Sequence, residues 1–308
     1  MAGNMLDRAL VLAMPAVPKV LVQPLSRRYI AGPDLADALE TIHMLDQAGR
    51  SATVDVLGEQ LTTRTQIEDL VQEYQRALDA FARERVNATL SVKMTGLGLA
   101  VDPKLCAANV RALVAAARDT SLTVELDMED SDTTTATIDL YRSLRDEGFD
   151  NLVIALQAYL RRTLSDVRAL APLAPRVRLV KGIWIEPATV AYADYETIRA
   201  NYVRLLEELL GSGAFVAIAS HDEWIHWRAL ESIDRHGLDQ DAYEFQMLLG
   251  VRAHLGDALV RDGHPVRVYV PYGVDWHAYS VRRFQENPQL AHHVMADMLD
   301  RARRRIRG

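Results

Sequence analysis

The segment Val266–Asn287 has the sequence VRVYVPYGVDWHAYSVRRFQEN. Its first part is rich in β-branched residues and therefore predicts a strand. The chain turns at Pro271-Tyr272-Gly273, and Asp275 is a suitable N-cap for a helix that follows. On that helix, four polar side chains are spaced i, i+3, i+4 and i+7 and share one face: Tyr279, Arg282, Arg283 and Glu286.

The paired arginines of this helix suggest a site for an anion. Two neighbouring guanidinium groups can clamp a carboxylate through forked, charge-assisted hydrogen bonds. The alternative is a solvent-exposed helix face on which Arg282 and Arg283 pair with Glu286. The spacing alone leaves both interpretations open.

Upstream of this segment, short strand-like runs alternate with amphipathic helical segments. Eight strands are predicted: Thr53–Val56, Ala88–Lys93, Leu122–Asp127, Leu152–Gln157, Arg176–Lys181, Phe215–Ser220, Tyr243–Leu248 and Val266–Pro271. The helical segments between them include Arg64–Arg83, Pro103–Arg118, Thr133–Asp146 and Tyr195–Leu210. Strands that alternate with helices indicate a parallel α/β sheet. Eight such units in about 250 residues match a closed (β/α)8 barrel of the TIM type.

A doubly wound open sheet is the alternative architecture. Its glycine-rich dinucleotide fingerprint is absent after the first strand, where the sequence is Leu57-Gly58-Glu59. We therefore predict an N-terminal helical segment at 1–50 packed on the barrel, a catalytic barrel at 51–290, and a C-terminal helix with a basic tail at 291–308. The barrel would thus carry extra N-terminal helices and a last helix that forms part of the site.

Composition narrows the class of protein. The 308 residues are 49% hydrophobic and carry a formal net charge of −7, which gives no reason to expect a nucleic-acid partner. The only cysteine, Cys106, excludes an internal disulfide and is typical of a reducing compartment. The apolar run Ala9–Met14 is too short to span a bilayer, and no net basic region precedes it, so we expect no signal peptide.

Nearly every predicted strand ends at a polar or ionisable residue. These residues are Asp55, Lys93, Asp127, Gln157, Arg178 with Lys181, Ser220 with His221, and Tyr269. Active sites of TIM-type barrels are built at the C-terminal ends of the strands, so this pattern predicts an active site there. The pair His221-Asp222 has no other nearby residue at metal-ligand spacing, and we expect no metal site.

Lys93 allows two kinds of chemistry. It could be a Schiff-base nucleophile, or it could pair with Asp127 at the end of the next strand and hold a substrate acid. A purely structural salt bridge is also compatible with the sequence. Glu125 has the same strand parity as Asp127 and is an alternative carboxylate.

Eight motifs, taken together and in order, resemble the monofunctional bacterial proline dehydrogenases over about residues 30 to 290. They are LGE at Leu57–Glu59, SVKMTGLGL at Ser91–Leu99, LDMED at Leu126–Asp130, LQAYLRRT at Leu156–Thr163, RLVKG at Arg178–Gly182, ASHD at Ala219–Asp222, YEFQMLLG at Tyr243–Gly250, and YVPYG through VRRFQEN at the end. The resemblance implies a flavoenzyme with FAD on a (β/α)8 barrel. Such an enzyme oxidises L-proline to Δ1-pyrroline-5-carboxylate by hydride transfer to the flavin, the first step of proline catabolism.

The resemblance also implies residue roles. Catalysis would involve Asp127 and Arg178, the latter beside the flavin. The substrate would be bound by Lys93, Leu248, Tyr269, Tyr279, Arg282 and Arg283. FAD would be bound by Met128, Gln157, Lys181, Gly182, Ile183, Ser220, His221 and Glu286. The sequence departs from the family pattern at Ile183 and Trp184, where Ala and Tyr are common, and at Ser220, where Thr is usual.

The same resemblance predicts partners. The electron acceptor would be a membrane quinone, and a pyrroline-5-carboxylate dehydrogenase would take the product. The tail DRARRRIRG carries five arginines that could attract anionic lipid, which would make a cytoplasmic protein peripheral on the inner face of the membrane. The alternative is a solvated helix end whose arginines offset the helix dipole. Dehydrogenases of hydroxyproline or another cyclic imino acid, and a Schiff-base lyase using Lys93 or Lys181, are the alternative activities.

Overall fold

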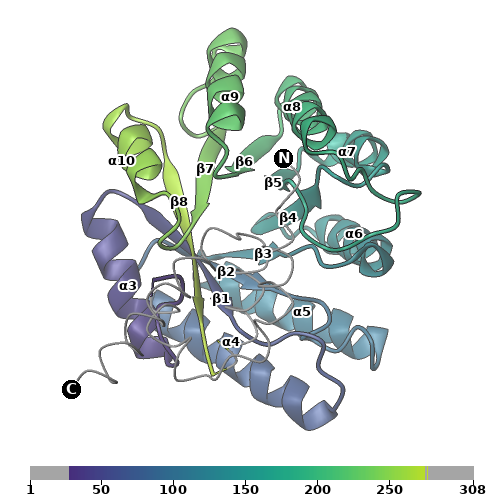
Figure 1. Cartoon of the computed structure of the whole chain (residues 1–308). Helices are drawn as coiled ribbons and strands as arrows, with labels where there is room; N and C mark the ends of the chain where they lie inside the picture. The colour runs from purple at the N-terminus through teal and green to yellow at the C-terminus, as the bar shows by residue number, and fades with distance from the viewer. Residues whose placement is uncertain (1–27, 275, 277–308) are drawn as a thin grey trace, which may run out of the picture.

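The computed structural model describes residues 28–274 and Trp276. Eight parallel strands close into a barrel in chain order (Figure 1). The strands are β1 (Ser51–Val56), β2 (Ala88–Val92), β3 (Thr123–Leu126), β4 (Leu152–Gln157), β5 (Arg176–Val180), β6 (Phe215–Ala219), β7 (Tyr243–Leu248) and β8 (Val266–Tyr272). The first and last strands pair from Ser51↔Arg267 to Val56↔Tyr272. The predicted (β/α)8 barrel is confirmed.

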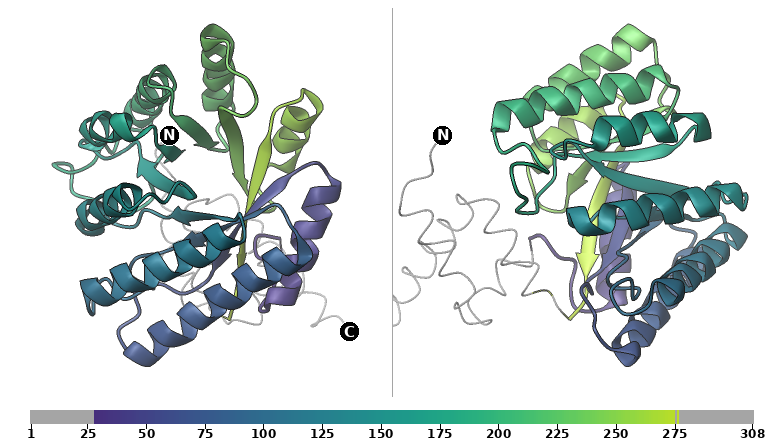
Figure 2. Two further views of the ribbon diagram at one scale, coloured as in Figure 1. Left: turned by 180° about the vertical axis from the view of Figure 1, so that it is seen from behind. Right: turned by 90° about the vertical axis from the view of Figure 1, so that its right-hand side faces the viewer.

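Helices surround the barrel on its outer side (Figures 1 and 2). They are α3 (Leu35–Gln47), α4 (Arg64–Glu84), α5 (Pro103–Asp119), α6 (Ser131–Asp146), α7 (Thr163–Leu170), the 3-10 helix η2 (Ala171–Leu173), α8 (Tyr195–Gly211), α9 (Glu223–His236) and α10 (Ala253–Arg261). The four helical segments named from the sequence lie within two residues of α4, α5, α6 and α8. Within residues 28–274, none of the helices combines the length and the hydropathy that a bilayer-spanning segment requires.

Side-chain caps fix where several helices begin. Asp102 accepts from the backbone N–H of Lys104 at 3.0 Å, and Pro103 occupies the first helical turn of α5. Asp130 caps α6 and Asp194 caps α8 in the same manner. Because these caps satisfy N–H groups that have no partner inside the helix, they fix the residue at which each helix begins.

The helix α3 lies outside the seam where the barrel closes. It contacts β1 and β8, between α10 and α4 (Figure 1). Just before it, the backbone N–H of Ala31 donates to the carbonyl of Pro271 at 2.9 Å, and that of Gly273 donates to the carbonyl of Gly32 at 3.0 Å. Helix α3 falls within the predicted N-terminal segment at 1–50, whose limits stay a prediction. The first 27 residues of that segment, the boundary at 290 and the predicted C-terminal helix lie outside the described residues, so those limits stay predictions.

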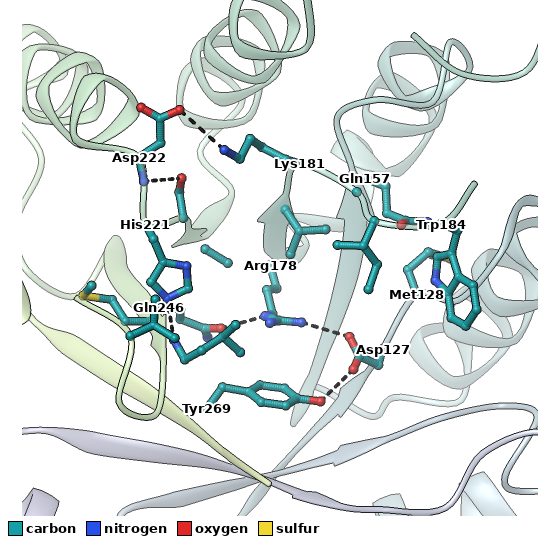
Figure 3. Close-up of a pocket in the computed structure, with 18 of the residues that line it drawn as sticks. Asp127, Met128, Gln157, Arg178, Lys181, Trp184, His221, Asp222, Gln246 and Tyr269 are labelled. Atoms are coloured by element: carbon teal, nitrogen blue, oxygen red, sulfur yellow. Dashed lines mark hydrogen bonds and ion pairs between the residues drawn. The ribbon is translucent and has the colours of Figure 1, made fainter. Parts of the chain in front are cut away.

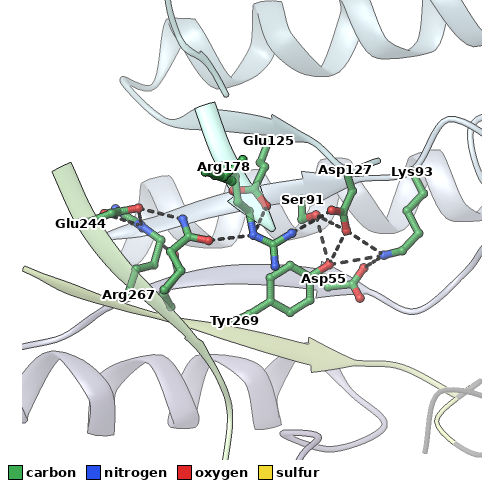
Figure 4. A network of polar contacts seen from close by, with 12 residues as sticks. Asp55, Ser91, Lys93, Glu125, Asp127, Arg178, Glu244, Arg267 and Tyr269 are labelled. Carbon is green, nitrogen blue, oxygen red and sulfur yellow. Dashed lines mark hydrogen bonds and ion pairs between the residues drawn. The ribbon is translucent and has the colours of Figure 1, made fainter. Parts of the chain in front are cut away.

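The two faces of the strands carry different kinds of side chain. Residues such as Leu90, Val124, Ile154 and Leu179 are buried in one apolar cluster with the helices. The alternate positions face the barrel interior and are largely polar: Asp55, Ser91, Glu125, Arg178, Glu244, Arg267 and Tyr269 (Figure 4). TIM-type barrels usually fill this space with branched apolar side chains. The interior of this barrel is therefore held together by hydrogen bonds and ion pairs.

The apolar layer between sheet and helices should dominate stability. We expect Ile154→Ala to lower the free energy of unfolding by about 2–5 kcal/mol, because its fully buried side chain would leave a cavity. The matched change Ile185→Ala removes a fully exposed side chain and should alter it by less than about 0.5 kcal/mol. Thermal and urea unfolding of both variants would check this. Equal destabilisation would contradict the dominant contribution of the buried apolar layer.

Candidate active site

A cavity of about 730 Å³ opens at the C-terminal ends of the strands. It contains twelve of the residues predicted for the site: Lys93, Asp127, Met128, Gln157, Arg178, Lys181, Gly182, Ile183, Ser220, His221, Leu248 and Tyr269. Several of them are labelled in Figure 3. The other four, Tyr279, Arg282, Arg283 and Glu286, lie outside the described residues. The cavity size falls within the range of small-molecule sites, roughly 300–1,000 Å³.

Strand boundaries explain how these residues reach the cavity. We predicted Lys93, Asp127, Lys181 and Ser220 as strand ends, whereas the structure ends these strands one residue earlier. Each of the four therefore occupies the first position of a loop. Two of them keep a backbone hydrogen bond to the neighbouring strand region: the N–H of Asp127 donates to the carbonyl of Val92 at 2.9 Å, and the carbonyl of Lys181 accepts from the N–H of Tyr159 at 2.8 Å. At this edge of the sheet all four side chains line the cavity.

Asp127 lies at the floor of the cavity among three donors. It accepts from Arg178 Nη1 at 2.9 Å, from Tyr269 Oη at 2.8 Å, and from Ser91 Oγ at 3.4 Å (Figure 4). Burial alone would raise the pKa of Asp127, but Arg178 and Lys93 outweigh it and hold the pKa below its usual value. Asp127 is therefore an anion that orients the groups around it.

The ammonium group of Lys93 lies between two carboxylates. Its Nζ lies 2.5 Å from Asp55 Oδ1 and 3.6 Å from Asp127 Oδ2. The predicted Lys93–Asp127 ion pair is therefore present, and Asp55 is a second and nearer partner that the sequence did not indicate. The reason is that β2 lies between β1 and β3, so acids on both sides are within reach of a lysine at its end. Burial would lower the pKa of Lys93, but Asp55, Tyr269 and Asp127 raise it well above its usual value.

Arg178 connects the cavity floor to the barrel interior. Its Nε donates to Gln246 Oε1 at 2.8 Å, and its guanidinium lies over the Tyr269 ring at 4.7 Å. Gln246 in turn donates to Glu244 at 2.8 Å, and Glu244 accepts from Arg267 Nε at 2.8 Å (Figure 4). Arg178 is thus fixed from several sides, and it presents a stationary positive charge at the base of the cavity.

The loop after β5 is held close to the cavity wall. Gly182 has φ +102°, and a Cβ added there would overlap the ring of Tyr159. A glycine is therefore required at this position by the packing of Tyr159. Gly182 also lines the cavity, and its predicted close approach to a ligand stays a prediction. Farther along, Glu186 accepts from the N–H and the hydroxyl of Ser131, both at 2.7 Å. This contact joins the loop to the start of α6.

Comparison with known proteins decides the family. A family model described as proline dehydrogenase matches residues 38–295. The chain belongs to the proline dehydrogenase family. Proline dehydrogenase 1 of Bacillus subtilis is 35% identical over 274 residues, covering 89% of this chain and 90% of that protein. Proline dehydrogenase of Deinococcus radiodurans is 35% identical over 279 residues with the same coverage.

Larger proteins share the fold. The crystal structure of proline utilization A from Bdellovibrio bacteriovorus, inactivated by N-propargylglycine, superposes with a TM-score of 0.81 at 24% identity. It covers 86% of this chain and 33% of that chain. The bifunctional protein PutA of Escherichia coli is 25% identical to this chain. The matched region covers 85% of this chain and 23% of PutA. This chain therefore matches one part of these longer proteins.

Within this family site, the structure also reveals residues that the sequence did not single out. Asp222 was considered only as a neighbour of His221. It accepts from Arg199 Nη2 at 2.6 Å and from Tyr195 Oη at 2.6 Å, and it lies 3.4 Å from Lys181 Nζ (Figure 3 shows the Asp222–Lys181 pair). Arg199 and Tyr195 lie on α8, too far along the chain for a local motif to connect them with Asp222.

His221 and Ser220 have internal partners. His221 Nε2 accepts from the backbone N–H of Leu248 at 2.8 Å and so ties the ends of β6 and β7 together. Ser220 Oγ accepts from the backbone N–H of Asp222 at 3.1 Å. In the part of the chain that the structure describes, no group of His, Cys, Asp and Glu side chains could hold a metal.

Asp222 should make the free energy of unfolding decrease as the pH falls into the acid range. Burial would raise its pKa, but Arg199, Tyr195 and Lys181 hold it well below the usual range. The folded carboxyl therefore binds its proton more weakly than the unfolded one, and its stabilising effect is present above about pH 3.9 and lost as pH falls through the folded pKa.

We expect Asp222→Asn to cost about 3 kcal/mol at neutral pH, the low end for a broken buried ion pair. Thermal unfolding at pH 7 and pH 3 would show the difference from the parent protein shrinking in acid. Asp257→Asn is the control, because Asp257 pairs with Arg50 at an exposed position and should change stability by about 1 kcal/mol or less. A difference that stays constant with pH would contradict the assigned ion pair.

Proposed function

We propose that the protein oxidises L-proline to Δ1-pyrroline-5-carboxylate with FAD bound in the cavity at the strand ends. Proline oxidation is the first step of proline catabolism, and the protein is an oxidoreductase of this class by its family membership. The family is flavin-dependent; the identity of the flavin and the role of each residue are our proposal. The observation that carries it is the fixed cluster of Asp127, Arg178, Lys93 and Tyr269 beneath the cavity.

The cavity fits FAD in charge and in lining. Lys181 and Arg199 supply positive charge that suits a diphosphate. Gln157 donates through Nε2 to the carbonyl of Glu129 at 2.8 Å, which directs its amide oxygen as an acceptor for a ligand N–H. Further contacts would come from Met128, Gly182, Ile183, Ser220 and His221. When bound, FAD supplies the two-electron acceptor that proline oxidation requires.

Arg178 contributes a fixed positive charge to this site. The Asp127 and Gln246 hydrogen bonds hold its guanidinium in place, so no reorganisation is needed when a bound ligand gains negative charge. Positive charge near a flavin ring favours its reduced, anionic form. Asp127 and Arg178 are therefore the residues that we propose for catalysis.

The substrate would lie between the cluster and the apolar wall. The protonated Lys93 can hold a carboxylate, and Tyr269 and Leu248 can contact the pyrrolidine ring. We propose that Tyr279, Arg282 and Arg283 complete the pocket and that Glu286 contacts the cofactor, from the sequence resemblance. These four residues are outside the described chain.

The Schiff-base alternative is disfavoured at Lys93. Its pKa is raised well above the usual value, chiefly by Asp55 and against the effect of burial, so the amine stays protonated and is not a nucleophile. We further propose a membrane quinone as electron acceptor, reached through peripheral contact of the basic tail, and a pyrroline-5-carboxylate dehydrogenase as the enzyme that takes the product.

The first test of this function is optical. Purified protein should contain FAD, and anaerobic L-proline should bleach its flavin absorbance. We expect Lys93→Met to retain FAD but to need at least about tenfold more proline for half-maximal bleaching, since tenfold corresponds to about 1.4 kcal/mol. Lys104→Met, at an exposed position on α5, is the matched control. A folded protein that binds no added FAD, or one that proline leaves oxidised, would reject the proposal.

A second test concerns substrate choice. Tyr269 is buried at the cavity floor and limits the room beside the ring, so we expect proline to be preferred over 4-hydroxyproline by about 10–200-fold in kcat/KM. Tyr269→Ser should reduce this preference, and Tyr269→Phe should keep it because the ring remains. Steady-state kinetics with both substrates would measure it. Equal efficiencies in the parent protein would favour a hydroxyproline or other imino-acid dehydrogenase.

A further inference from the structure

Glu125 is a buried acid that the proposed function does not use. It lies on β3, two residues before Asp127, with its side chain inside the barrel and no exposed surface. Neither of its carboxylate oxygens has a hydrogen-bond partner in the described chain. Its shortest polar contact is an ion pair of 3.5 Å with Arg178 Nε (Figure 4). An ionised carboxylate without hydrogen bonds is costly in such a place.

The cations around Glu125 already have shorter contacts with other acceptors. Arg178, on β5, donates to Asp127 at 2.9 Å and to Gln246 at 2.8 Å. Arg267, on β8, donates to Glu244 at 2.8 and 3.0 Å. The flanking strands add no charge beside Glu125, because Ser91 and Val153 are its register partners on β2 and β4.

Charges of the same sign also face Glu125. Asp127 lies on its own strand and Glu244 lies on β7, and both disfavour its ionised form. Burial is the largest effect, and with these neighbours it outweighs Arg178 and Arg267 and raises the pKa of Glu125 to about 7. A carboxyl with a pKa near 7 gains or loses its charge around neutral pH.

We propose that Glu125 is a positioning residue that acts through Arg178. When Glu125 is protonated, the Arg178 guanidinium binds Asp127 and its positive charge faces the cavity. When Glu125 is ionised, it attracts the same guanidinium from the opposite side and partly neutralises its charge. The proposal rests on the proposed function in one respect, namely that a flavin binds above Arg178. Ionised Glu125 weakens the positive field at the cavity floor. The flavin then becomes harder to reduce, and proline oxidation slows as pH rises through neutrality.

The test compares Glu125→Gln with the parent protein, both loaded with FAD. Gln has the size of the protonated acid and cannot ionise. Glu244→Gln is the matched control, because Glu244 is a buried interior glutamate whose carboxylate is bound to Gln246 and Arg267. Glu125→Met is the second variant, since it is also uncharged and of similar length. Three quantities are followed between about pH 5 and pH 8.5, the interval around the neutral range of titration.

The first quantity is thermal stability, which does not depend on catalysis. A raised folded pKa means that Glu125 supports the fold most below its unfolded pKa and loses that effect as pH rises through the folded pKa. The melting temperature of Glu125→Gln relative to the parent should therefore rise from pH 5 to pH 8. Glu244→Gln should lower it across the range. Parallel curves for Glu125→Gln and the parent would show that Glu125 does not titrate there and would overturn the proposal.

The second and third quantities are the flavin midpoint potential and kcat/KM for proline. The parent should show a break near neutral pH in the potential and a loss in kcat/KM on the order of threefold to tenfold, the size of effect that one unit charge produces across several ångströms of protein. Both changes are measured relative to Glu125→Gln, and Glu125→Met should give the same pH curves as Glu125→Gln. Glu244→Gln should keep both changes but move them to lower pH, because it removes a charge that disfavours ionised Glu125. Potential curves of the parent and the Glu125 variants that run parallel through this pH range would overturn the link through Arg178.

Failure of the proposed function is distinguishable from failure of this inference. A folded protein that binds no FAD would reject the function and the coupling to the flavin, whereas the melting curves would still report the proton on Glu125. A protein that binds FAD and is reduced by proline, with identical pH curves in parent and Glu125→Gln, would leave the function standing and reject the role of Glu125.

Discussion

The ion pair between Arg178 and Asp127 is the contact on which the rest of the site depends. It spans the barrel from β5 to β3, and each member recruits further partners: Asp127 binds Tyr269, and Arg178 binds Gln246. Each partner satisfies a group that burial would otherwise leave without hydrogen bonds. These contacts offset part of the cost of burying polar groups in the barrel interior, and Glu125 is the exception whose two carboxylate oxygens have no hydrogen-bond partner in the described chain.

The strand pattern carried most of the information about the fold. Eight strand-like runs alternating with amphipathic segments were enough to predict the closed barrel. Eight of the polar residues at or beside their ends line one cavity, whereas Met128, Gly182, Ile183 and Leu248 were named only through the family resemblance. This succeeded because parallel strands in a barrel bring their C-terminal ends to one face whatever lies between them.

The side-chain contacts inside the site could not be predicted from the sequence. The sequence predicts the Lys93–Asp127 pair but not the nearer contact of Lys93 with Asp55, because strand order places an acid on either side of the lysine and does not give the distances. Arg199 was missed because it comes from a helix that packs back over the next strand end. Neither distance follows from periodicity. The close packing of Tyr159 against Gly182 was hidden for the same reason, since the contact depends on a loop path.

The seam between β1 and β8 sets the order in which the molecule can be completed. Arg267 donates to the backbone carbonyl of Ala52 at 2.8 Å, a contact between residues 215 positions apart in the chain. During synthesis, roughly ten to forty seconds separate the emergence of these two partners at ordinary elongation rates. Until β8 arrives, β1 has a free edge and the interior stands open to water. The interior side chains are mostly polar or charged, so water can solvate them until β8 pairs with β1 and closes the barrel.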